Sequence, residues 1–366
     1  MKFTCDKIVL LREISIAQDI IASKNAISIL SNIYLEAEND SLVIKATDMK
    51  VSFETKVPVN VIEAGSATVF GDKFFGIVNS FPCDEIEFSQ KELNIIIKPT
   101  VQKKPEYKLK SIASDKFPEF PVSNTPFFDM PIKDFKDMVQ QTVFAVSDDE
   151  TRYFMNGVFL EKNEDKINMV ATDGRRLAFI NKHAEKEISD FSGIIIPPKI
   201  LNTIVKRSGD EGLVSISVSD KTIFINFASY KFSSTLIEGT FPNYRKVIPE
   251  NQTFSLSIKR DEMLSALRRV ALMVEQKSHR IYFGISSGKM TVYSEESEMG
   301  TVEDEISCEY EGEELTIALN YRYIEEPLKV IKDDDIIIHF TGATKAITIE
   351  PVPAKDFFHI VMPMQS

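Results

Sequence analysis

The sequence has no tryptophan, three cysteines, four histidines and no apolar run long enough to cross a membrane. A transmembrane helix needs about 20 consecutive, mostly apolar residues, so a membrane-spanning protein is not expected. The first twenty residues include Asp6, Arg12 and Glu13, where a secretory signal peptide would need an unbroken apolar core. We therefore expect a cytoplasmic protein in which this segment belongs to the mature fold.

The scarcity of cysteine and histidine limits the chemistry of the chain. Cys5, Cys83 and Cys308 are odd in number, far apart and without a C-x-x-C pair, which is typical of free thiols in a reducing compartment. None of the scattered histidines has the i, i+4 spacing of a metal pair on a helix. The sequence therefore predicts neither a metal site nor a cofactor.

Positive charge is also in deficit, with 43 basic against 55 acidic residues and a net charge of −12. Nucleic-acid binding depends on neutralising phosphates with Lys and Arg, so the total charge by itself disfavours it. A total does not say which face carries the basic residues, however, and a local basic surface can bind a polyanion on an acidic protein. Whether a polyanion can bind therefore depends on where the basic residues lie.

The sequence contains an internal repeat. The triplet Ala46-Thr47-Asp48 returns as Ala171-Thr172-Asp173, about 125 residues further on. Other features that recur at about this offset are Phe-Pro at 117–118 and 241–242, Ile-Lys at 132–133 and 258–259, and helix-like segments at 71–81, 197–209 and 319–334. Three units of about 122 residues would fill the chain of 366 residues.

Each unit has an α+β pattern. Residues 131–147 begin with a proline suited to the first helical turn, and the apolar residues Ile132, Phe135, Val139, Val143 and Val146 follow at helical spacing. Short apolar or alternating runs, separated by turn residues, then predict strands. The expected fold class is α+β, with three tandem copies of a domain that has two helices and roughly eight strands.

Basic residues recur on the polar faces of the predicted helices. Lys133 and Lys136 lie opposite most of the apolar stripe of the 131–147 helix, and Lys199 and Lys206 do so on the 197–207 helix. On a single helix, a solvated face is the usual explanation. Repetition over several helices of an acidic chain makes a surface for a polyanion about as plausible.

The chain offers little support for an enzyme. The segment 284–290, GISSGKM, resembles a phosphate loop but has one residue too few between its glycines and ends in Met290 where Ser or Thr is required. Asp173-Gly174 between apolar runs is a strong turn signal. Neither G-x-S-x-G nor G-x-G-x-x-G occurs. We expect no catalytic residues.

Five motifs carry a resemblance to a known family: the opening Met1–Thr4, RYFMNG at 152–157, ATDGRRLA at 171–178, FPNYRKVIP at 241–249 and VMPM at 361–364. Together they resemble the bacterial DNA polymerase III β subunit, the sliding clamp. The resemblance covers the whole chain and implies clamp domains at 1–126, 127–251 and 252–366. It further implies a head-to-tail homodimer that forms a ring, with helices lining a pore around duplex DNA.

In this family the clamp has no reaction of its own and acts as a processivity factor. The resemblance therefore implies binding to double-stranded DNA of any sequence, to the replicative polymerase catalytic subunit, to the clamp loader and to other proteins with clamp-binding peptides. These peptides enter a hydrophobic cleft between the second and third domains. The residues of this chain that match the cleft are Met155, Thr172, Gly174, Arg175, Arg176, Leu177, Pro242, Val247, Asn320, Tyr323, Ala346, Ile360, Met362, Pro363 and Met364.

The resemblance also implies DNA-contacting and dimer residues. Those expected to contact DNA are Lys24, Lys133, Lys136, Tyr153, Phe154, Lys199 and Lys206. Those expected in the apolar seam of the dimer are Phe75, Val78, Leu109, Leu272 and Met273. Charge complementarity is expected between Lys98, Lys103, Lys104, Lys108 and Lys110 at one edge and Glu295, Glu296, Glu298, Glu303 and Glu305 at the other.

Departures from the family lie at the rim of the cleft. Relatives often have a histidine at the position of Arg175 and a basic residue at that of Gln365, so peptide preference is expected to differ. For the polar anchors of a bound peptide we select Arg176 and Asn320. Two alternatives remain at this point: a peptide-binding scaffold or clamp paralogue without a ring, and a phosphate-ester enzyme that uses Asp173.

Overall fold

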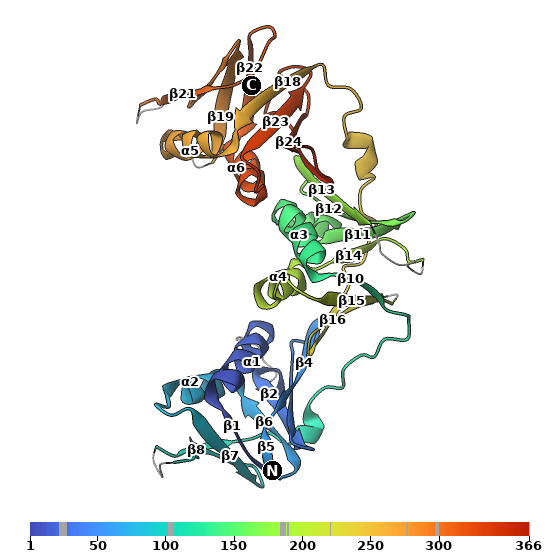
Figure 1. Ribbon diagram of the computed structural model, residues 1–366, viewed down its shortest axis with the longest axis vertical. Coiled ribbons are helices and arrows are strands. Elements are labelled where there is room, and N and C mark those ends of the chain that lie inside the picture. The colour runs from blue at the N-terminus through green and yellow to red at the C-terminus, as the bar shows by residue number, and fades with distance from the viewer. Residues whose placement is uncertain are drawn as a thin grey trace. The chain divides into compact units, whose positions relative to one another are not determined.

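The computed structural model describes residues 1–21, 28–101, 105–183, 188, 190–219, 221–275, 277–296 and 300–365. The chain divides into two compact units. Unit 1 consists of Met1–Phe135, Glu185–Ser189 and Lys199–Leu236, and unit 2 consists of Lys136–Ala184, Asp190–Pro198 and Ile237–Ser366. Figure 1 shows their helices and strands, coloured along the chain.

One order of elements is repeated three times along the described chain. The first copy consists of β1 (Lys2–Asp6), α1 (Lys7–Ile20), β2 (Asn32–Glu38), β3 (Ser41–Thr47), β4 (Val51–Pro58), β5 (Asn60–Glu63), β6 (Gly65–Phe70), α2 (Gly71–Ser80), β7 (Glu85–Lys91), β8 (Asn94–Pro99) and β9 (Tyr107–Lys110). The second consists of β10 (Phe128–Pro131), α3 (Ile132–Thr142), β11 (Val158–Asn163), β12 (Lys166–Thr172), β13 (Arg176–His183), β14 (Ile194–Ile196), α4 (Pro198–Arg207), β15 (Leu213–Val218), β16 (Thr222–Phe227) and β17 (Tyr230–Thr235).

The third copy consists of β18 (Phe254–Lys259), α5 (Arg260–Val270), β19 (Arg280–Ser286), β20 (Lys289–Tyr293), β21 (Glu303–Ser307), β22 (Leu315–Asn320), α6 (Tyr321–Val330), β23 (Asp335–Phe340), β24 (Ile347–Val352) and β25 (Phe357–Val361). Two helices and eight or nine strands therefore recur in each copy, which confirms the predicted α+β fold class. The segment 284–290, which lacks the spacing of a phosphate loop, forms the turn of the β19–β20 hairpin, with Gly288 at a φ of 78°.

Strands of consecutive copies join into shared sheets. Unit 1 contains a five-stranded sheet of order β5-β1-β7-β8-β9 and an eight-stranded sheet of order β10-β15-β16-β17-β4-β3-β2-β6. Unit 2 contains an eight-stranded sheet of order β14-β11-β12-β13-β25-β24-β23-β18 and a four-stranded sheet of order β21-β20-β19-β22. We call the β4–β17 contact the first junction and the β13–β25 contact the second junction.

The two junctions have the same register. In the first junction Phe53 of β4 lies opposite Phe232 of β17, and in the second Ala178 of β13 lies opposite His359 of β25. Counting along the paired strands from the β2–β3 and β11–β12 hairpins shows that Phe53 and Ala178 are equivalent positions of the repeat. The edge-to-edge contact is therefore repeated along with the strands.

The helices pack apolar faces on these sheets. Helix α1 begins where the Asp6 carboxylate accepts a hydrogen bond from the backbone N–H of Val9 at 2.9 Å, and it buries Leu10, Ile14 and Ala17. Helix α3 is shorter than the predicted 131–147. It ends at Thr142, whose φ of −125° leaves the helical range, and a short 3₁₀ turn at Val143–Ala145 follows.

The repeated Thr-Asp motif forms the same turn twice. In the first copy the Thr47 hydroxyl donates to the carbonyl of Val51 at 2.9 Å, and the Asp48 carboxylate accepts from the N–H groups of Lys50 and Val51. Met49 takes a left-handed φ of 74° in this turn. Because side chain and backbone close the loop together, the motif fixes the path from β3 to β4.

The second turn repeats these contacts between β12 and β13. The Thr172 hydroxyl donates to the carbonyl of Arg176 at 2.5 Å, and the Asp173 carboxylate accepts from the N–H groups of Arg175 and Arg176. Gly174 takes the left-handed position, with a φ of 88°. The internal echo in the sequence is therefore a structural turn.

None of the helices described in the structure is long and apolar enough to cross a membrane. Among the same residues, no group of three or more His, Cys, Asp or Glu side chains is arranged to hold a metal ion.

Candidate functional site

The residues expected to form the peptide cleft all lie in unit 2, and we call them the docking surface. They come from the 3₁₀ helix Glu150–Met155, the β12–β13 turn, the segment between β17 and β18, the N-terminus of α6, the residue before β24 and the end of β25. In chain order they are Met155, Thr172, Gly174, Arg175, Arg176, Leu177, Pro242, Val247, Asn320, Tyr323, Ala346, Ile360, Met362, Pro363 and Met364.

The docking surface has a buried apolar floor and an exposed apolar rim. Leu177 and Ile360 face each other across β13 and β25 and belong to a buried cluster with Phe241 and Tyr244. Val247 and Met362 are 55% and 44% exposed. Because Phe241 and Tyr244 flank Pro242, the segment between β17 and β18 is held against this floor. Exposed apolar side chains over such a floor are typical of a protein-docking site.

Backbone hydrogen bonds hold the C-terminal segment in place. The N–H of Met362 donates to the carbonyl of Arg175 at 2.9 Å, and the N–H of Met364 donates to the carbonyl of Ala318 at 2.8 Å. The second bond fixes the segment beside β22. The backbone is therefore positioned while the unbranched methionine side chains keep their rotamer freedom, which suits them to partners of different shape.

Arg176 is committed to contacts within the unit. Its Nε lies 3.1 Å from the Asp173 carboxylate, a terminal nitrogen pairs with Glu326, and the other donates to the carbonyl of Phe144 at 2.7 Å. Its guanidinium also lies 4.6 Å from the ring centroid of Tyr323, and the side chain is only 10% exposed. Arg176 thus joins the β12–β13 turn to α6, and few of its donors remain for a peptide.

Arg175 and Asn320 are placed to meet a partner. The Arg175 side chain is exposed at the tip of the turn. Asn320 caps α6 through its Oδ1, which accepts from the N–H of Arg322 at 3.0 Å. Its amide N–H₂ group is not used by that bond. Met155 and Thr172 are buried and support the surface from below.

His359 lies beneath the docking surface and is 1% exposed. Burial, with a smaller contribution from the charge of Arg176, lowers the pKa of His359 to about 3. Its Nε2 lies 3.1 Å from the Oε1 of Gln141, and the ring is near Phe144. A neutral imidazole therefore fills the space behind the Arg176 contacts.

Sequence reasoning missed the roles of Phe144, Glu326 and His359. In the sequence Glu326 only diluted the basic character of its helix, and His359 was one scattered histidine among four. Nothing in their local sequence signals a contact with Arg176, which is 32 positions from Phe144 and 150 from Glu326. Only the packing of the turn after α3, of α6 and of β25 beside β13 brings the three residues to Arg176.

The basic residues expected to contact DNA are partly neutralised within the chain. In unit 1 the Lys199 ammonium lies 2.6 Å from the Asp48 carboxylate and donates to the carbonyl of Ile20, while Lys206 lies 3.2 Å from Asp19. Lys133 is exposed and Lys136 is half-buried, and Lys24 lies outside the described residues. The helices thus present positive charge in a diluted form.

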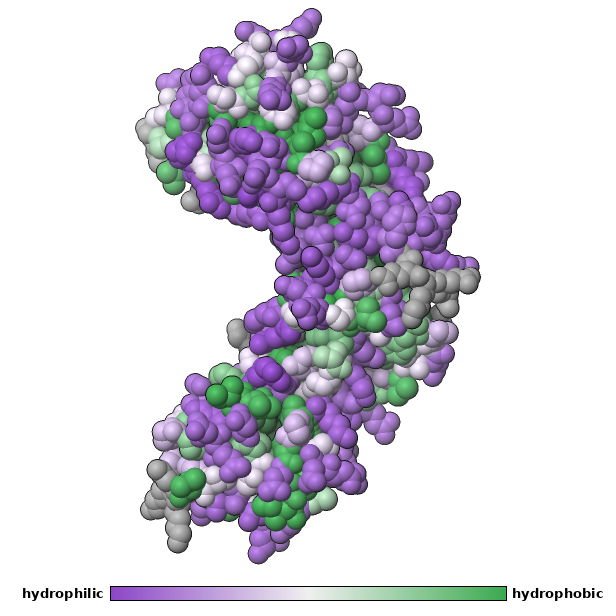
Figure 2. All heavy atoms as spheres, in the orientation of Figure 1, coloured by the Kyte–Doolittle hydropathy of each residue, from purple (hydrophilic) through white to green (hydrophobic). Residues whose placement is uncertain are grey.

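The third copy shows the same dilution in unit 2. Arg268 lies 3.6 Å from Glu325, which also pairs with Lys329, and Arg269 lies 2.6 Å from Asp304. The face shown in Figure 2 is mostly hydrophilic over α5 and α6.

Of the two neighbouring aromatic residues, Tyr153 is exposed to solvent and Phe154 is partly buried. Tyr153 is 52% exposed, whereas Phe154 packs on the cluster beneath the docking surface. Gly239 lies close to both, since a Cβ there would come within 3.1 Å of the Cβ of Phe154. Of the two expected DNA-contacting rings, Tyr153 is therefore the one that is exposed to solvent.

The residues expected in the dimer seam also differ in how far their side chains are exposed. Leu272 is 80% exposed, and Phe75, Leu109 and Met273 are half-buried. Val78, a residue of α2, is 0% exposed, and its side chain belongs to the core of unit 1. The expected lysine edge is partly paired inside the chain, Lys98 with Glu87 and Lys108 with Glu106. Lys103, Lys104 and Glu298 lie outside the described residues.

Comparison with known proteins finds matches along nearly the whole chain. Models of the N-terminal, central and C-terminal domains of the DNA polymerase III beta subunit match residues 1–121, 129–243 and 245–365. The beta sliding clamps of Treponema pallidum and Chlamydia muridarum are 44% and 29% identical to this chain. The alignments cover all of this chain and 100% and 99% of those proteins.

Solved structures match equally well. A DnaN sliding clamp from Pseudomonas aeruginosa bound to griselimycin superimposes with a TM-score of 0.95 and covers all of both chains at 25% identity. A DNA polymerase sliding clamp from Bacillus subtilis superimposes with a TM-score of 0.94 at 25% identity, covering 100% of this chain and 99% of that one. The chain therefore belongs to the family of DNA polymerase III β subunits, the sliding clamps, which are processivity subunits and not enzymes.

Proposed function

We propose that this chain closes head to tail with a second copy into a ring around duplex DNA in the bacterial cytoplasm. The ring tethers the replicative polymerase catalytic subunit and receives the clamp loader and other partners on the docking surface. Its clamp domains run over 1–126, 127–251 and 252–366. A tethered polymerase that lets go of DNA stays at high effective concentration and rebinds, which gives processivity without any new catalytic group.

The repeated junction register is the observation that carries this proposal. Among the described strands, β9 ends the five-stranded sheet and β21 ends the four-stranded sheet. β9 is the equivalent of β17 and β25, and β21 is the equivalent of β4 and β13. A third junction between β21 of one chain and β9 of the next would repeat the contact that occurs twice within the chain. Such a heterologous contact forms a ring when the rotation closes.

The paired basic residues suit a clamp that moves along DNA. Exposed ion pairs such as Lys206–Asp19 contribute only about 0–1 kcal/mol, so a phosphate can replace the carboxylate at little cost. Contacts to phosphates carry no base information, and binding of this kind is independent of sequence. Because the ring supplies the residence time, weak contacts allow sliding.

The docking surface has the features needed to bind an extended peptide. Apolar side chains of the peptide would pack on the floor formed by Leu177 and Ile360, and the side chains of Met362 and Met364 would adapt to their shape. We assign the polar anchors to Arg175 and Asn320. Arg176, which the sequence also suggested as an anchor, is assigned a positioning role because its guanidinium already holds the turn against α6.

Retention on circular DNA tests the ring. Purified protein is loaded onto a nicked plasmid by a clamp loader, and the bound fraction is measured by gel filtration before and after linearisation. A ring stays on the circle and slides off the linear form. A peptide-binding scaffold without a ring would be retained on neither form, and an ordinary DNA-binding protein would be retained equally on both. Either result would rule out the proposal.

Truncation tests the docking surface separately. Deletion of residues 362–366 removes the rim methionines and leaves the edge strands β9 and β21 untouched. We expect a fluorescein-labelled clamp-binding peptide of the polymerase to lose affinity for the truncated protein, while the molar mass by light scattering stays that of a dimer. Unchanged peptide affinity would show that the docking surface is assigned to the wrong residues.

A further inference from the structure

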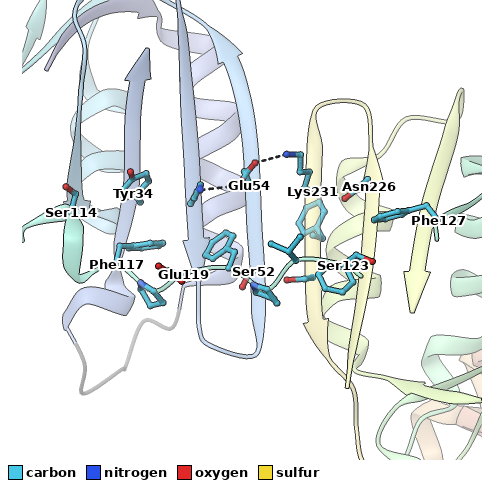
Figure 3. Close-up of a pocket in the computed structure, with 18 of the residues that line it drawn as sticks. Tyr34, Ser52, Glu54, Ser114, Phe117, Glu119, Ser123, Phe127, Asn226 and Lys231 are labelled. Atoms are coloured by element: carbon cyan, nitrogen blue, oxygen red, sulfur yellow. Dashed lines mark hydrogen bonds and ion pairs between the residues drawn. The ribbon is translucent and has the colours of Figure 1, made fainter. Parts of the chain in front are cut away.

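Unit 1 contains a cavity of about 750 Å³ at the first junction. There the segment after β9 crosses the face of the sheet that lies away from the helices (Figure 3). Its volume is within the range of about 300–1,000 Å³ that is usual for ligand sites. The residues that line it are Tyr34, Lys45, Ser52, Glu54, Ser114, Asp115, Phe117, Pro118, Glu119, Phe120, Pro121, Val122, Ser123, Phe127, Phe224, Asn226, Lys231, Phe232 and Ser233.

The cavity occupies the place in the first junction that the docking-surface floor occupies in the second. Equivalent strand positions show this: Ser52 and Ser233 face each other where Leu177 and Ile360 do in the second junction. The crossing segments also correspond, because each places a Phe-Pro pair over the sheet. Phe117 lies 5.4 Å from Tyr34, and Phe241 lies 4.7 Å from Phe159, which is the equivalent of Tyr34.

The chemistry of the two places differs. In the second junction the opposed rings of Phe179 and Phe358 stack at 4.8 Å. At the equivalent positions of the first junction, Glu54 and Lys231 form an ion pair at 2.9 Å, visible in Figure 3. A stacked pair of apolar rings in the second junction therefore corresponds to a charged pair in the first, beside the cavity.

Two lysines share one carboxylate in this cavity. The Lys231 ammonium pairs with one oxygen of Glu54, and the Lys45 ammonium lies 3.3 Å from the other. Burial alone raises the pKa of Glu54, but the hydrogen bond from Lys231 and the charge of Lys45 hold its pKa below the ordinary value. Each ammonium has three donors, so one carboxylate leaves several of them for an incoming anion.

Two aromatic rings lie beside the Lys45 ammonium. Lys45 lies 5.7 Å from the ring centroid of Tyr34 and 5.6 Å from that of Phe120. Phe127 is 44% exposed on the opposite side of the cavity. Asp115 and Glu119 also line the cavity, from the crossing segment, but both are exposed to water, whose high dielectric constant weakens their interaction with the lysines.

We propose that this cavity is a second docking site of the chain, which binds an extended peptide segment with an aromatic side chain next to a carboxylate. The aromatic ring would lie among Phe117, Phe120 and Phe127, and the carboxylate would pair with Lys45 and Lys231. The site is separate from the docking surface and selects a different chemistry. It does not depend on ring formation, since every lining residue belongs to unit 1.

A fluorinated peptide provides the test. The probe is the acetylated and amidated peptide serine–glutamate–4-fluorophenylalanine–glutamate–serine, titrated with full-length protein and followed by ¹⁹F NMR. We expect saturable binding with a dissociation constant below about 1 mM. The analogue with lysine in place of both glutamates should bind at least about tenfold more weakly, because it brings like charge to the two lysines.

Variants locate the binding. Lys231→Glu should weaken binding of the acidic probe by about tenfold or more, whereas the matched control Lys56→Glu, an exposed lysine of β4 outside the cavity, should change it by less than about twofold. Lys45→Met removes the second charge and keeps the side-chain length, so it serves if Lys231→Glu fails to fold beside Glu54. Deletion of residues 362–366 should have no effect.

Three results would overturn the proposal. One is the absence of saturable binding to the wild-type protein, and another is equal binding of the acidic and lysine peptides. The third is binding that survives both Lys231→Glu and Lys45→Met but is lost on deletion of 362–366, which would place the probe on the docking surface. None of these outcomes bears on retention on circular DNA, so the two proposals are tested separately.

Discussion

The Thr-Asp turns show how the same residues serve as scaffold in two places and as part of a site in only one. Both turns use the threonine hydroxyl and the aspartate carboxylate to close the backbone. They differ at the residue with left-handed φ, which is Met49 in the first turn and Gly174 in the second. Only the second turn continues into two arginines beside the docking surface.

Exchange at the left-handed position tests this equivalence. A non-glycine residue in this conformation costs about 1–2 kcal/mol, while glycine costs about 0.5–1 kcal/mol in chain entropy, so Met49→Gly should stabilise the protein by up to about 1 kcal/mol. Gly174→Ala should destabilise it by a similar amount, and its Cβ would also come within 2.9 Å of the Arg152 side chain. Urea unfolding measures both, and a loss of stability in Met49→Gly would contradict the strain argument.

His359 gives the protein a specific sensitivity to acid. Its pKa is about 3 in the fold and about 6.5 in a model peptide, so the unfolded chain takes up the proton first. The stability due to the neutral imidazole is therefore complete above pH 6.5 and is lost as the pH falls from 6.5 toward 3. At pH 5 the loss should be about 2 kcal/mol, from about 1.4 kcal/mol per pH unit.

The control for this prediction comes from the repeat. Phe232 occupies the position equivalent to His359 in the first junction, so His359→Phe is a matched substitution without a titrating group. We expect the difference in unfolding free energy between wild type and variant to shift by about 2 kcal/mol in favour of the variant between pH 7.5 and pH 5. A difference that stays constant would mean that His359 does not titrate on unfolding in this range.

At the scale of the elements, the chain builds each large sheet from two half-sheets that meet edge to edge. The strands at the meeting edges are held by backbone hydrogen bonds, whose geometry is indifferent to side chains. This is why the first junction tolerates Ser52 and Ser233 where the second has Leu177 and Ile360. The two junctions therefore keep the same strand register although the side chains that face each other across them differ.

This register predicts the dimer contact in detail. If β21 and β9 of two chains pair as β4 and β17 do, Thr301 lies opposite Lys108 of the next chain, as Ser52 lies opposite Ser233. The double variant Lys108→Cys/Thr301→Cys should therefore form a disulfide-linked dimer under mild oxidation, because opposed Cβ atoms in such strands are about 4.5–5.5 Å apart. Non-reducing electrophoresis detects the product.

A shifted pair provides the control. Lys110→Cys/Thr301→Cys moves one cysteine by two residues along β9, which separates the Cβ atoms by about 7–8 Å. It should cross-link far more slowly. Equal rates for the two pairs would mean that the third junction has another register or is absent.

At the scale of the whole molecule, an acidic chain can bind DNA because charge is distributed unequally and diluted by ion pairs. The basic side chains of α4 are tied to Asp19 and Asp48, and those of α5 to Glu325 and Asp304. Acidic residues are numerous elsewhere, giving the net charge of −12. Weak phosphate binding in the pore and repulsion of DNA from other surfaces both follow from this arrangement.

The assembled molecule should loosen as salt rises. The proposed edges carry lysines on one side and glutamates on the other, and exposed charges of this kind are screened when the Debye length falls from about 10 Å at 0.1 M to about 3 Å at 1 M. Light scattering at micromolar concentration should give a dimer at low salt and a growing monomer fraction at high salt. A monomer at low salt would exclude the closed ring.

The repeat made most of the fold predictable. Apolar periodicity and turn residues recur at a fixed offset, so the helices at 71–81, 197–209 and 319–334 and the strands between them could be read locally, and α2, α4 and α6 confirm these helices. Helix ends were less predictable. The helix expected at 131–147 ends at Thr142 because its backbone leaves the helical range there, which no residue pattern indicates.

The sequence by itself therefore determined the three copies, the turn chemistry and the family, because each depends on residues close together in the chain or on whole motifs. The tertiary structure decided what the side chains do. It buries Val78, commits Arg176 to Glu326 and ties Lys199 to Asp48, since each of these contacts joins residues brought together only by folding. It also places two rings opposite each other at one junction and two opposite charges at the other, because the paired strands are far apart in the chain.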